Sequence, residues 1–174
     1  MLKRKLIPMT LIKGSVFGCL FALMIVITMI GTAKAAEDQH AARGKQVMLV
    51  LDTFMDGLNQ LDLNKHFQTY HFPHFRYASG KINIFKNAAA AMPFLDESKE
   101  QQRKRLLKFL GPEWDHSAWT RRDIVQGDEG KVHVATTFVR YRKDGTAIRA
   151  YESLYVMTFE NGRWGIKGRS SFAP

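Results

Sequence analysis

The C-terminal stretch that decides the fold reads KVHVATTFVRYRKDGTAIRAYESLYVMTFENGRWGIKGRSSFA, from Lys131 to Ala173. Its three runs of β-branched and aromatic residues are separated by Asp144-Gly145 and by Asn161-Gly162. Asp-Gly and Asn-Gly favour two-residue type I′ turns, because both central positions of such a turn need a positive φ. The stretch therefore predicts three consecutive antiparallel strands joined by two tight hairpins.

Two-residue turns fix which residues face one another across each hairpin. The predicted pairs are Arg140 with Arg149, Phe138 with Tyr151, Thr136 with Ser153, Phe159 with Trp164, Met157 with Ile166, and Tyr155 with Gly168. Because side chains alternate along a strand, these residues share one mostly aromatic and apolar face, assigned to the core together with Ser170 and Phe172. The other face, which includes Glu152, Lys167 and Arg169, is mixed and is expected to meet solvent or a second subunit.

The first 35 residues have the pattern of a secretory signal peptide. A positive start is followed by an uncharged run from Gly14 to Gly31, and Ala33-Lys34-Ala35 is a small-x-small cleavage site. The positive start consists of Lys3, Arg4, Lys5 and Lys13. Cleavage predicts a periplasmic or secreted protein. The alternative is an uncleaved segment that anchors the protein in a membrane, since the run is just long enough to span a bilayer.

Much of the positive charge belongs to this N-terminal segment. The chain has 26 Lys and Arg against 16 Asp and Glu, and five of the 26 precede residue 36. The remainder carries 21 basic against 16 acidic residues, which argues against a nucleic-acid partner. It contains no cysteine, as suits an oxidising compartment, and it is long enough for one domain with its own core. We predict a polar lead-in at residues 36–44 and a single domain at residues 45–174.

The part of this domain that precedes the hairpins predicts helices and a small β-hairpin. Apolar residues recur at helical spacing, Asp62 can cap a second helix, and Ser98 opens a capping box with Gln101. In chain order the expected elements are a helix at 45–61, a short helix at 62–70, a hairpin at 75–85, an Ala-rich helix at 87–94, a helix at 98–110 and a strand at 114–125. The register of this last strand stays open.

The order of these elements resembles the nuclear transport factor 2-like superfamily. The marks that carry the resemblance are Leu61-Asp62-Leu63 after the first helix and the final hairpin from Glu160 to Ile166. This hairpin is similar to that of SnoaL-like and ketosteroid-isomerase-like members, and the layout is similar to the association domain of the calmodulin-dependent kinase. The resemblance implies an α+β fold, in which a cone-shaped, curved antiparallel sheet wraps around about three N-terminal helices. It does not choose among the functions of the superfamily.

Candidate catalytic residues lie between the short helix and the small hairpin. His71 and His74 flank Pro73, with Tyr70 and Tyr77 close by. A histidine near a pocket can act as a general acid or base, so a dehydratase-like site is one hypothesis. The alternative is a pair of structural histidines. Ketosteroid-isomerase-like enzymes use a tyrosine of the first helix and pocket carboxylates, and both are missing here, which argues against isomerase chemistry of that kind.

Candidate ligand-binding residues lie on the assigned core face of the central sheet and beside the two histidines, where Tyr70 and Tyr77 are found. Trp119 joins them if the register of its strand places it on the pocket wall. The set comprises Tyr70, Tyr77, Trp119, Thr136, Arg140, Arg149, Tyr151, Ser153 and Tyr155. Arg140 and Arg149 would form a cationic rim for a small apolar or carboxylate-bearing ligand. The alternative is that both arginines extend to solvent at the strand ends.

These observations predict an exported module that binds a small ligand or mediates assembly, acting without a metal or another cofactor. The expected form of assembly is a homodimer through the outer face of the sheet. The alternative function is a lyase or isomerase that acts on a small ring substrate through His71 or His74.

Overall fold

The computed structural model describes residues 16–172, with side chains from Glu37 onward. The chain divides after Ala41 into two compact units, and the folded domain is the second of them. The first helix, α1 (Val16–Asn59), begins well before the predicted start at Lys45, because Ala-rich residues with high helix propensity continue it through the predicted lead-in. Within residues 16–172, no helix is both long enough and apolar enough to cross a membrane.

Only part of the predicted export signal lies within the residues that the structure describes. The positive start at Lys3, Arg4, Lys5 and Lys13 lies outside the described residues, and Ala33 to Ala35 lie within α1. Cleavage after Ala35 therefore stays a prediction.

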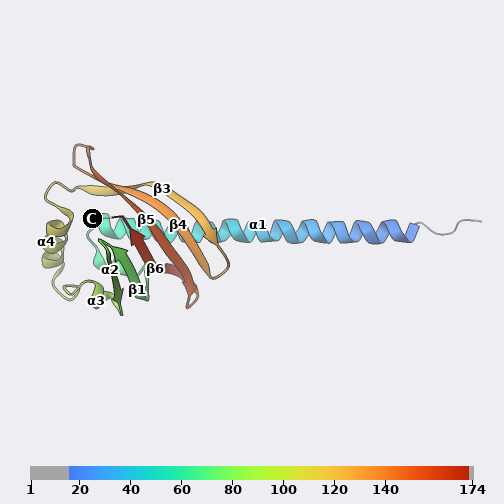
Figure 1. Ribbon diagram of the computed structural model, residues 1–174, viewed down its shortest axis with the longest axis horizontal. Coiled ribbons are helices and arrows are strands. Elements are labelled where there is room, and N and C mark those ends of the chain that lie inside the picture. The colour runs from blue at the N-terminus through green and yellow to red at the C-terminus, as the bar shows by residue number, and fades with distance from the viewer. Residues whose placement is uncertain (1–15, 173–174) are drawn as a thin grey trace, which may run out of the picture. The chain divides into compact units, whose positions relative to one another are not determined.

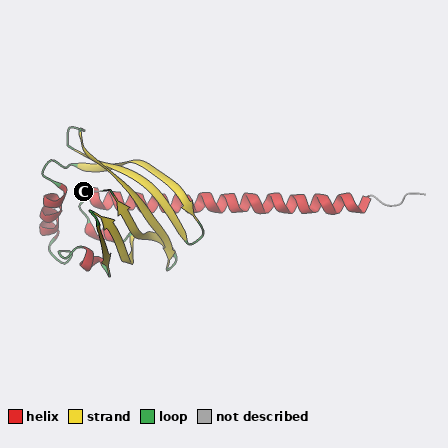
Figure 2. Ribbon diagram, viewed as in Figure 1, coloured by secondary structure: helices red, strands yellow, loops and turns green. Residues whose placement is uncertain are grey.

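Six strands form one curved sheet whose order is β2-β1-β6-β5-β4-β3 (Figures 1 and 2). Their bounds are β1 (Tyr70–Ala78), β2 (Lys81–Phe85), β3 (His116–Gly127), β4 (Lys131–Tyr141), β5 (Ala147–Glu160) and β6 (Arg163–Ser171). Neighbours are antiparallel except β1 and β6, which run parallel, so the sheet is mixed. The expected α+β fold with a curved sheet is confirmed, but the expectation of a wholly antiparallel sheet was wrong at the pairing of β1 with β6.

The hairpin between β4 and β5 has the predicted register. Arg140 pairs with Arg149, Phe138 with Tyr151, and Thr136 with Ser153. The positive φ of Gly145 in its turn is the conformation that glycine adopts without strain. The Asp-Gly signal thus located the hairpin and the strand faces correctly from Arg140 inward. The predicted two-residue type I′ turn was wrong, because Asp144 does not have a positive φ and Tyr141 pairs with Ala147 after a register shift.

The hairpin between β5 and β6 departs from the prediction at a β-bulge. Met157 pairs with Ile166, but Val156 already pairs with Gly168, so Lys167 is the extra residue. Tyr155 consequently pairs with Arg169 and not with Gly168. Beyond the bulge the two faces of β6 are exchanged, so the predicted positions of Arg169, Ser170 and Phe172 were wrong. Arg169 lies on the concave face, and Phe172 is exposed.

Three short helices follow α1. They are α2 (Leu63–Phe67), α3 (Ala88–Ala91) and α4 (Lys99–Leu110). Figure 1 shows α4 beyond the ends of the strands, at the left of the picture. Asp62, Asn87 and Ser98 accept hydrogen bonds from backbone N–H groups at their N-termini, and Ser98 forms the predicted capping box with Gln101. The strand predicted at 114–125 is β3, in which Trp119 pairs with Phe138 just before the first of two register shifts.

Two hydrophobic clusters hold the helices against the sheet. In the first, Val47, Leu51 and Phe54 of α1 pack against strands β4, β5 and β6. In the second, Leu106 and Leu110 of α4 pack with residues of α2 and with Trp114. The last turns of α1 and the helix α2 lie where these clusters meet, and the space beside them is the candidate site.

Candidate ligand pocket

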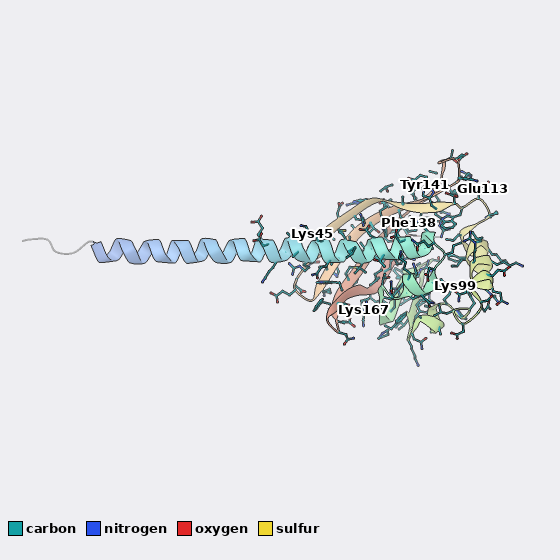
Figure 3. The ribbon with its side chains drawn as sticks, turned by 180° about the vertical axis from the view of Figure 1, so that it is seen from behind. Lys45, Lys99, Glu113, Phe138, Tyr141 and Lys167 are labelled. Carbon is teal, nitrogen blue, oxygen red and sulfur yellow. The ribbon has the colours of Figure 1, made fainter. Side chains whose placement is uncertain are left out.

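A cavity of about 500 Å³ lies between the concave face of the sheet and helices α1, α2 and α4. Most of its lining is apolar, with Leu58, Leu63 and Phe67 on one side and Phe138 on the sheet. Phe138 is labelled in Figure 3, and its ring lies edge-on to Trp119. The volume is within the range of roughly 300–1,000 Å³ that is usual for small-molecule pockets.

Three arginines from three different strands reach this cavity: Arg76 of β1, Arg140 of β4 and Arg169 of β6. Arg76 and Arg169 are direct partners in the parallel register of β1 and β6. No Asp or Glu of the described chain lines the cavity, and none of the ion pairs in residues 37–172 involves these arginines. The pocket therefore carries a concentrated positive charge without a carboxylate from the described residues.

The guanidinium groups are held mainly by uncharged partners. Arg169 Nη1 donates to Tyr155 Oη at 3.0 Å, and Arg140 Nη1 donates to the carbonyl of Leu110 at 3.3 Å. The Arg140 guanidinium also lies 4.8 Å from the ring centre of Tyr151. The Nε atoms of Arg76 and Arg140 are buried without a hydrogen-bond partner. Burial, with a smaller contribution from Arg169, lowers the pKa of Arg76, and burial also lowers the pKa of Arg140.

A chain of hydrogen bonds runs along one wall of the cavity from Phe54 through His66 to Tyr70. His66 Nδ1 lies 3.0 Å from the carbonyl oxygen of Phe54, which can only accept, so Nδ1 carries the proton. Burial lowers the pKa of His66 to about 4, so the ring is neutral and its Nε2 accepts from Tyr70 Oη at 3.2 Å. Burial also raises the pKa of Tyr70. The Tyr70 hydroxyl is thereby oriented with its proton toward His66 and its lone pairs free for other contacts.

His74 is the second histidine of the cavity wall. Its Nδ1 lies 3.2 Å from the carbonyl oxygen of Ile166, and its ring meets that of Tyr70 at 4.4 Å in a T-shaped contact. Burial lowers the pKa of His74 to about 4. The carbonyl requires a proton on Nδ1, so Nε2 has a free lone pair near neutral pH. Of the two predicted bases, His74 lines the pocket and His71 does not, so the predicted lyase or isomerase site would use His74.

The structure places His71 and Tyr77 away from the cavity. Side chains alternate along β1, so these residues lie on the opposite face from Tyr70, His74 and Arg76. His71 Nδ1 lies 3.0 Å from Thr158 Oγ1, and its ring packs so closely over Gly165 that a Cβ there would approach Nε2 to 2.7 Å. Tyr77 is 48% exposed. The prediction that His71 and Tyr77 contribute to the pocket was wrong.

The other predicted ligand-binding residues divide into three groups. Tyr70, Arg140, Tyr151 and Tyr155 line the cavity. Trp119, Thr136 and Ser153 lie on the predicted face but pack beneath the lining; Trp119 Nε1 donates to the carbonyl of Leu51 and Thr136 Oγ1 to that of Ser153. Arg149 is exposed, which agrees with the alternative that arginines at the strand ends extend to solvent. Its guanidinium lies 5.7 Å from the ring centre of Tyr151.

Sequence reasoning missed five polar residues of the cavity: His66, Arg76, Ser79, Arg169 and Ser171. The alternation that places His74 inward also places Arg76 inward, so the strand period carried a usable signal for that residue. Arg169 gave no such signal, because the bulge at Lys167 reverses its face. Among residues 37–172, no cluster of three or more His, Cys, Asp or Glu side chains is arranged to hold a metal ion.

The fold and the pocket define a class of α+β domain in which a curved sheet and helices enclose a small cavity. A family model described as an NTF2-like protein (DUF6841) matches residues 45–170, and the chain belongs to this family. No match was found among curated proteins.

Solved structures share the fold at low sequence identity. An NTF2-like protein with a cystatin-like fold from Novosphingobium aromaticivorans has a TM-score of 0.61 at 13% identity, covering 82% of this chain and 88% of that one. The association domain of CaMKII from C. elegans has a TM-score of 0.57 at 14% identity, covering 78% of this chain and 99% of that one. A protein of unknown function with a cystatin-like fold from Nostoc punctiforme has a TM-score of 0.55 at 13% identity, covering 75% and 90%.

Proposed function

We propose that this domain binds a small, mainly apolar ligand in the cavity between α1, α2, α4 and the sheet. The observation that carries the proposal is the cavity of about 500 Å³, whose lining combines apolar side chains with arginine, histidine and tyrosine side chains. Apolar walls supply affinity on ligand binding, and sparse polar groups set orientation. The proposal includes export by the N-terminal segment, so that the domain acts in the periplasm or outside the cell.

Ala91 and Ala90 of α3 provide a matched test. Ala91 lines the cavity, whereas its neighbour Ala90 is exposed and does not. The neutral fluorescent probe N-phenylnaphthylamine is expected to bind the wild-type chain with blue-shifted emission. Ala91→Trp is expected to weaken this binding at least about tenfold, because the indole occupies the space that the probe would fill.

The variant Ala90→Trp is the control and is expected to bind the probe like the wild type. Equal binding by all three chains, or no binding by the wild type, would show that the cavity is not a ligand site.

A second candidate function is self-association through the outer face of the sheet. No helix of residues 42–172 packs on this face in the hydrophobic clusters, and apolar side chains lie on it beside Glu152. Leu154 is 37% exposed there, with Val139 and Val156 partly buried nearby. The similarity in fold to a CaMKII association domain supports assembly as a candidate for this chain. We propose a homodimer in which these faces meet.

Leu154→Glu is expected to convert such a dimer into a monomer, because it would bring additional like charges together within a self-complementary interface. Light scattering over a range of protein concentrations measures the change in mass. Leu49→Glu, at an exposed position on α1, is the control and is expected to leave the mass unchanged. A wild-type chain that is monomeric at every concentration would exclude this interface.

A further inference from the structure

The positive charge inside the cavity is the feature that an apolar ligand alone does not explain. Arg76 and Arg169 are direct register partners on β1 and β6, and Arg140 reaches the same cavity from β4. Like charges placed opposite one another on neighbouring strands repel, and burial of a charge without a counter-charge is costly. The lining contributed by the described residues has three cations and no carboxylate. Within the described residues, these three arginines therefore have no counter-charge in the cavity.

The other polar groups of the cavity are uncharged, so they do not neutralise the arginines. Both histidines have one nitrogen committed to a backbone carbonyl, and the Tyr70 proton is directed to His66. Neither histidine nor Tyr70 carries a positive charge near neutral pH, so an anion would not find additional cations among these groups. The buried Nε atoms of Arg76 and Arg140, which have no hydrogen-bond partner, are the donors left over.

The apolar lining lies mainly on the helical side of the cavity. Leu58 and Leu63 come from α1 and α2, and Leu106 and Leu110 come from α4, whereas the arginines all come from strands. The cavity thus has a cationic side and an apolar side. A ligand that fits both sides has an anionic end and an apolar end.

We propose that the cavity takes an amphiphilic carboxylic acid, with its carboxylate among Arg76, Arg140 and Arg169 and its hydrocarbon part against the helices. This inference rests on the proposed function and adds the chemical class of the ligand. Guanidinium groups suit it because their planar fork matches the two oxygens of a carboxylate. Arg169 is oriented by Tyr155, and Arg140 is oriented by the Leu110 carbonyl and the face of Tyr151.

The test compares cis-parinaric acid with its methyl ester, which has the same hydrocarbon chain and no charge. Titration of the full chain, followed by parinaroyl fluorescence at pH 7, is expected to give a dissociation constant at least about tenfold lower for the acid. Arg76→Gln and Arg140→Gln are each expected to reduce this preference at least about fivefold, while binding of the ester changes little. Retained ester binding also shows that each variant still has a folded cavity.

Arg149→Gln is the matched control. Arg149 pairs with Arg140 across β4 and β5, but it is exposed and does not line the cavity. This variant is expected to keep the full preference for the acid. Equal affinity for acid and ester in the wild type, or no binding of the acid, would overturn the inference. If N-phenylnaphthylamine still binds in an Ala91-dependent way, the proposed apolar pocket stands in either case; if it does not, the pocket itself fails.

Discussion

Replacing Gly168 with alanine is expected to lower the free energy of unfolding by about 3 kcal/mol. Gly168 lies on β6 directly across from Phe75 of β1, and an added Cβ would overlap Cε1, Cζ and Cδ1 of the Phe75 ring. Its φ is not in the left-handed region, so the requirement for glycine is one of space. The ring cannot withdraw without loosening the pairing of β1 with β6. Urea unfolding followed by circular dichroism measures the change.

The cause can be separated from a general intolerance of alanine by a double-mutant cycle. Phe75→Ala removes the ring, so the cost of Gly168→Ala in that background is expected to fall below about 1 kcal/mol. Gly130→Ala is the control, because the nearest atom to an added Cβ there is Asp128 Oδ1 at 3.8 Å, an ordinary contact. Additive effects of the Gly168 and Phe75 substitutions would contradict this account.

Acidification from pH 7 to pH 4 is expected to destabilise the domain through His66 and His74. Burial lowers the pKa of each from 6.5 to about 4. Between these values the unfolded state binds more protons than the folded state, so unfolding becomes more favourable as the pH falls. The stabilising contribution is fully present above about pH 6.5 and is lost progressively toward pH 4. For each ring it is on the order of 3 kcal/mol.

Urea unfolding at pH 7, 6, 5 and 4 gives the free energy of unfolding as a function of pH. Histidine variants assign the loss of stability to individual residues. His66→Gln and His74→Gln are each expected to be less stable than the wild type at pH 7 but to lose less stability on acidification. His40→Gln, at an exposed position, is the control and is expected to follow the wild-type profile. Carboxylates with lowered pKa values, such as Glu160, also titrate at the acidic end, so the difference between variant and wild type is the decisive quantity. A wild-type profile that is flat between pH 6.5 and pH 4 would contradict the role of both rings.

The fold could be predicted from the sequence because its strongest signals are local. Asp144-Gly145 located a hairpin whose predicted register is confirmed from the Thr136–Ser153 pair to the Arg140–Arg149 pair. A capping residue and a helical period likewise located α4. The parallel pairing of β1 with β6 could not be inferred from such signals, because it joins segments far apart in the chain and leaves no turn between them.

The cavity was less accessible to prediction, for two physical reasons. A β-bulge has no defined sequence signature, and the extra residue Lys167 moved Arg169 from the predicted outer face to the cavity. The second reason was avoidable. His71 and His74 are three residues apart, so in an extended strand they point to opposite faces, and only His74 could share the face of Arg76. The predicted pair of His71 and His74 therefore left out Arg76, which shares its face of β1 with His74.

The parallel pairing of β1 with β6 also has a consequence for how the domain folds. The hydrogen bond between His74 Nδ1 and the Ile166 carbonyl joins residues that are 92 positions apart in the chain. Forming it therefore closes a long loop, at a cost in chain entropy. Contacts of such high sequence separation are slow to form, whereas the β4–β5 hairpin closes locally. Arg76 and Arg169 meet only when this pairing closes. The repulsion between them therefore arises at the end of folding, after most of the hydrophobic contacts that can offset it have formed.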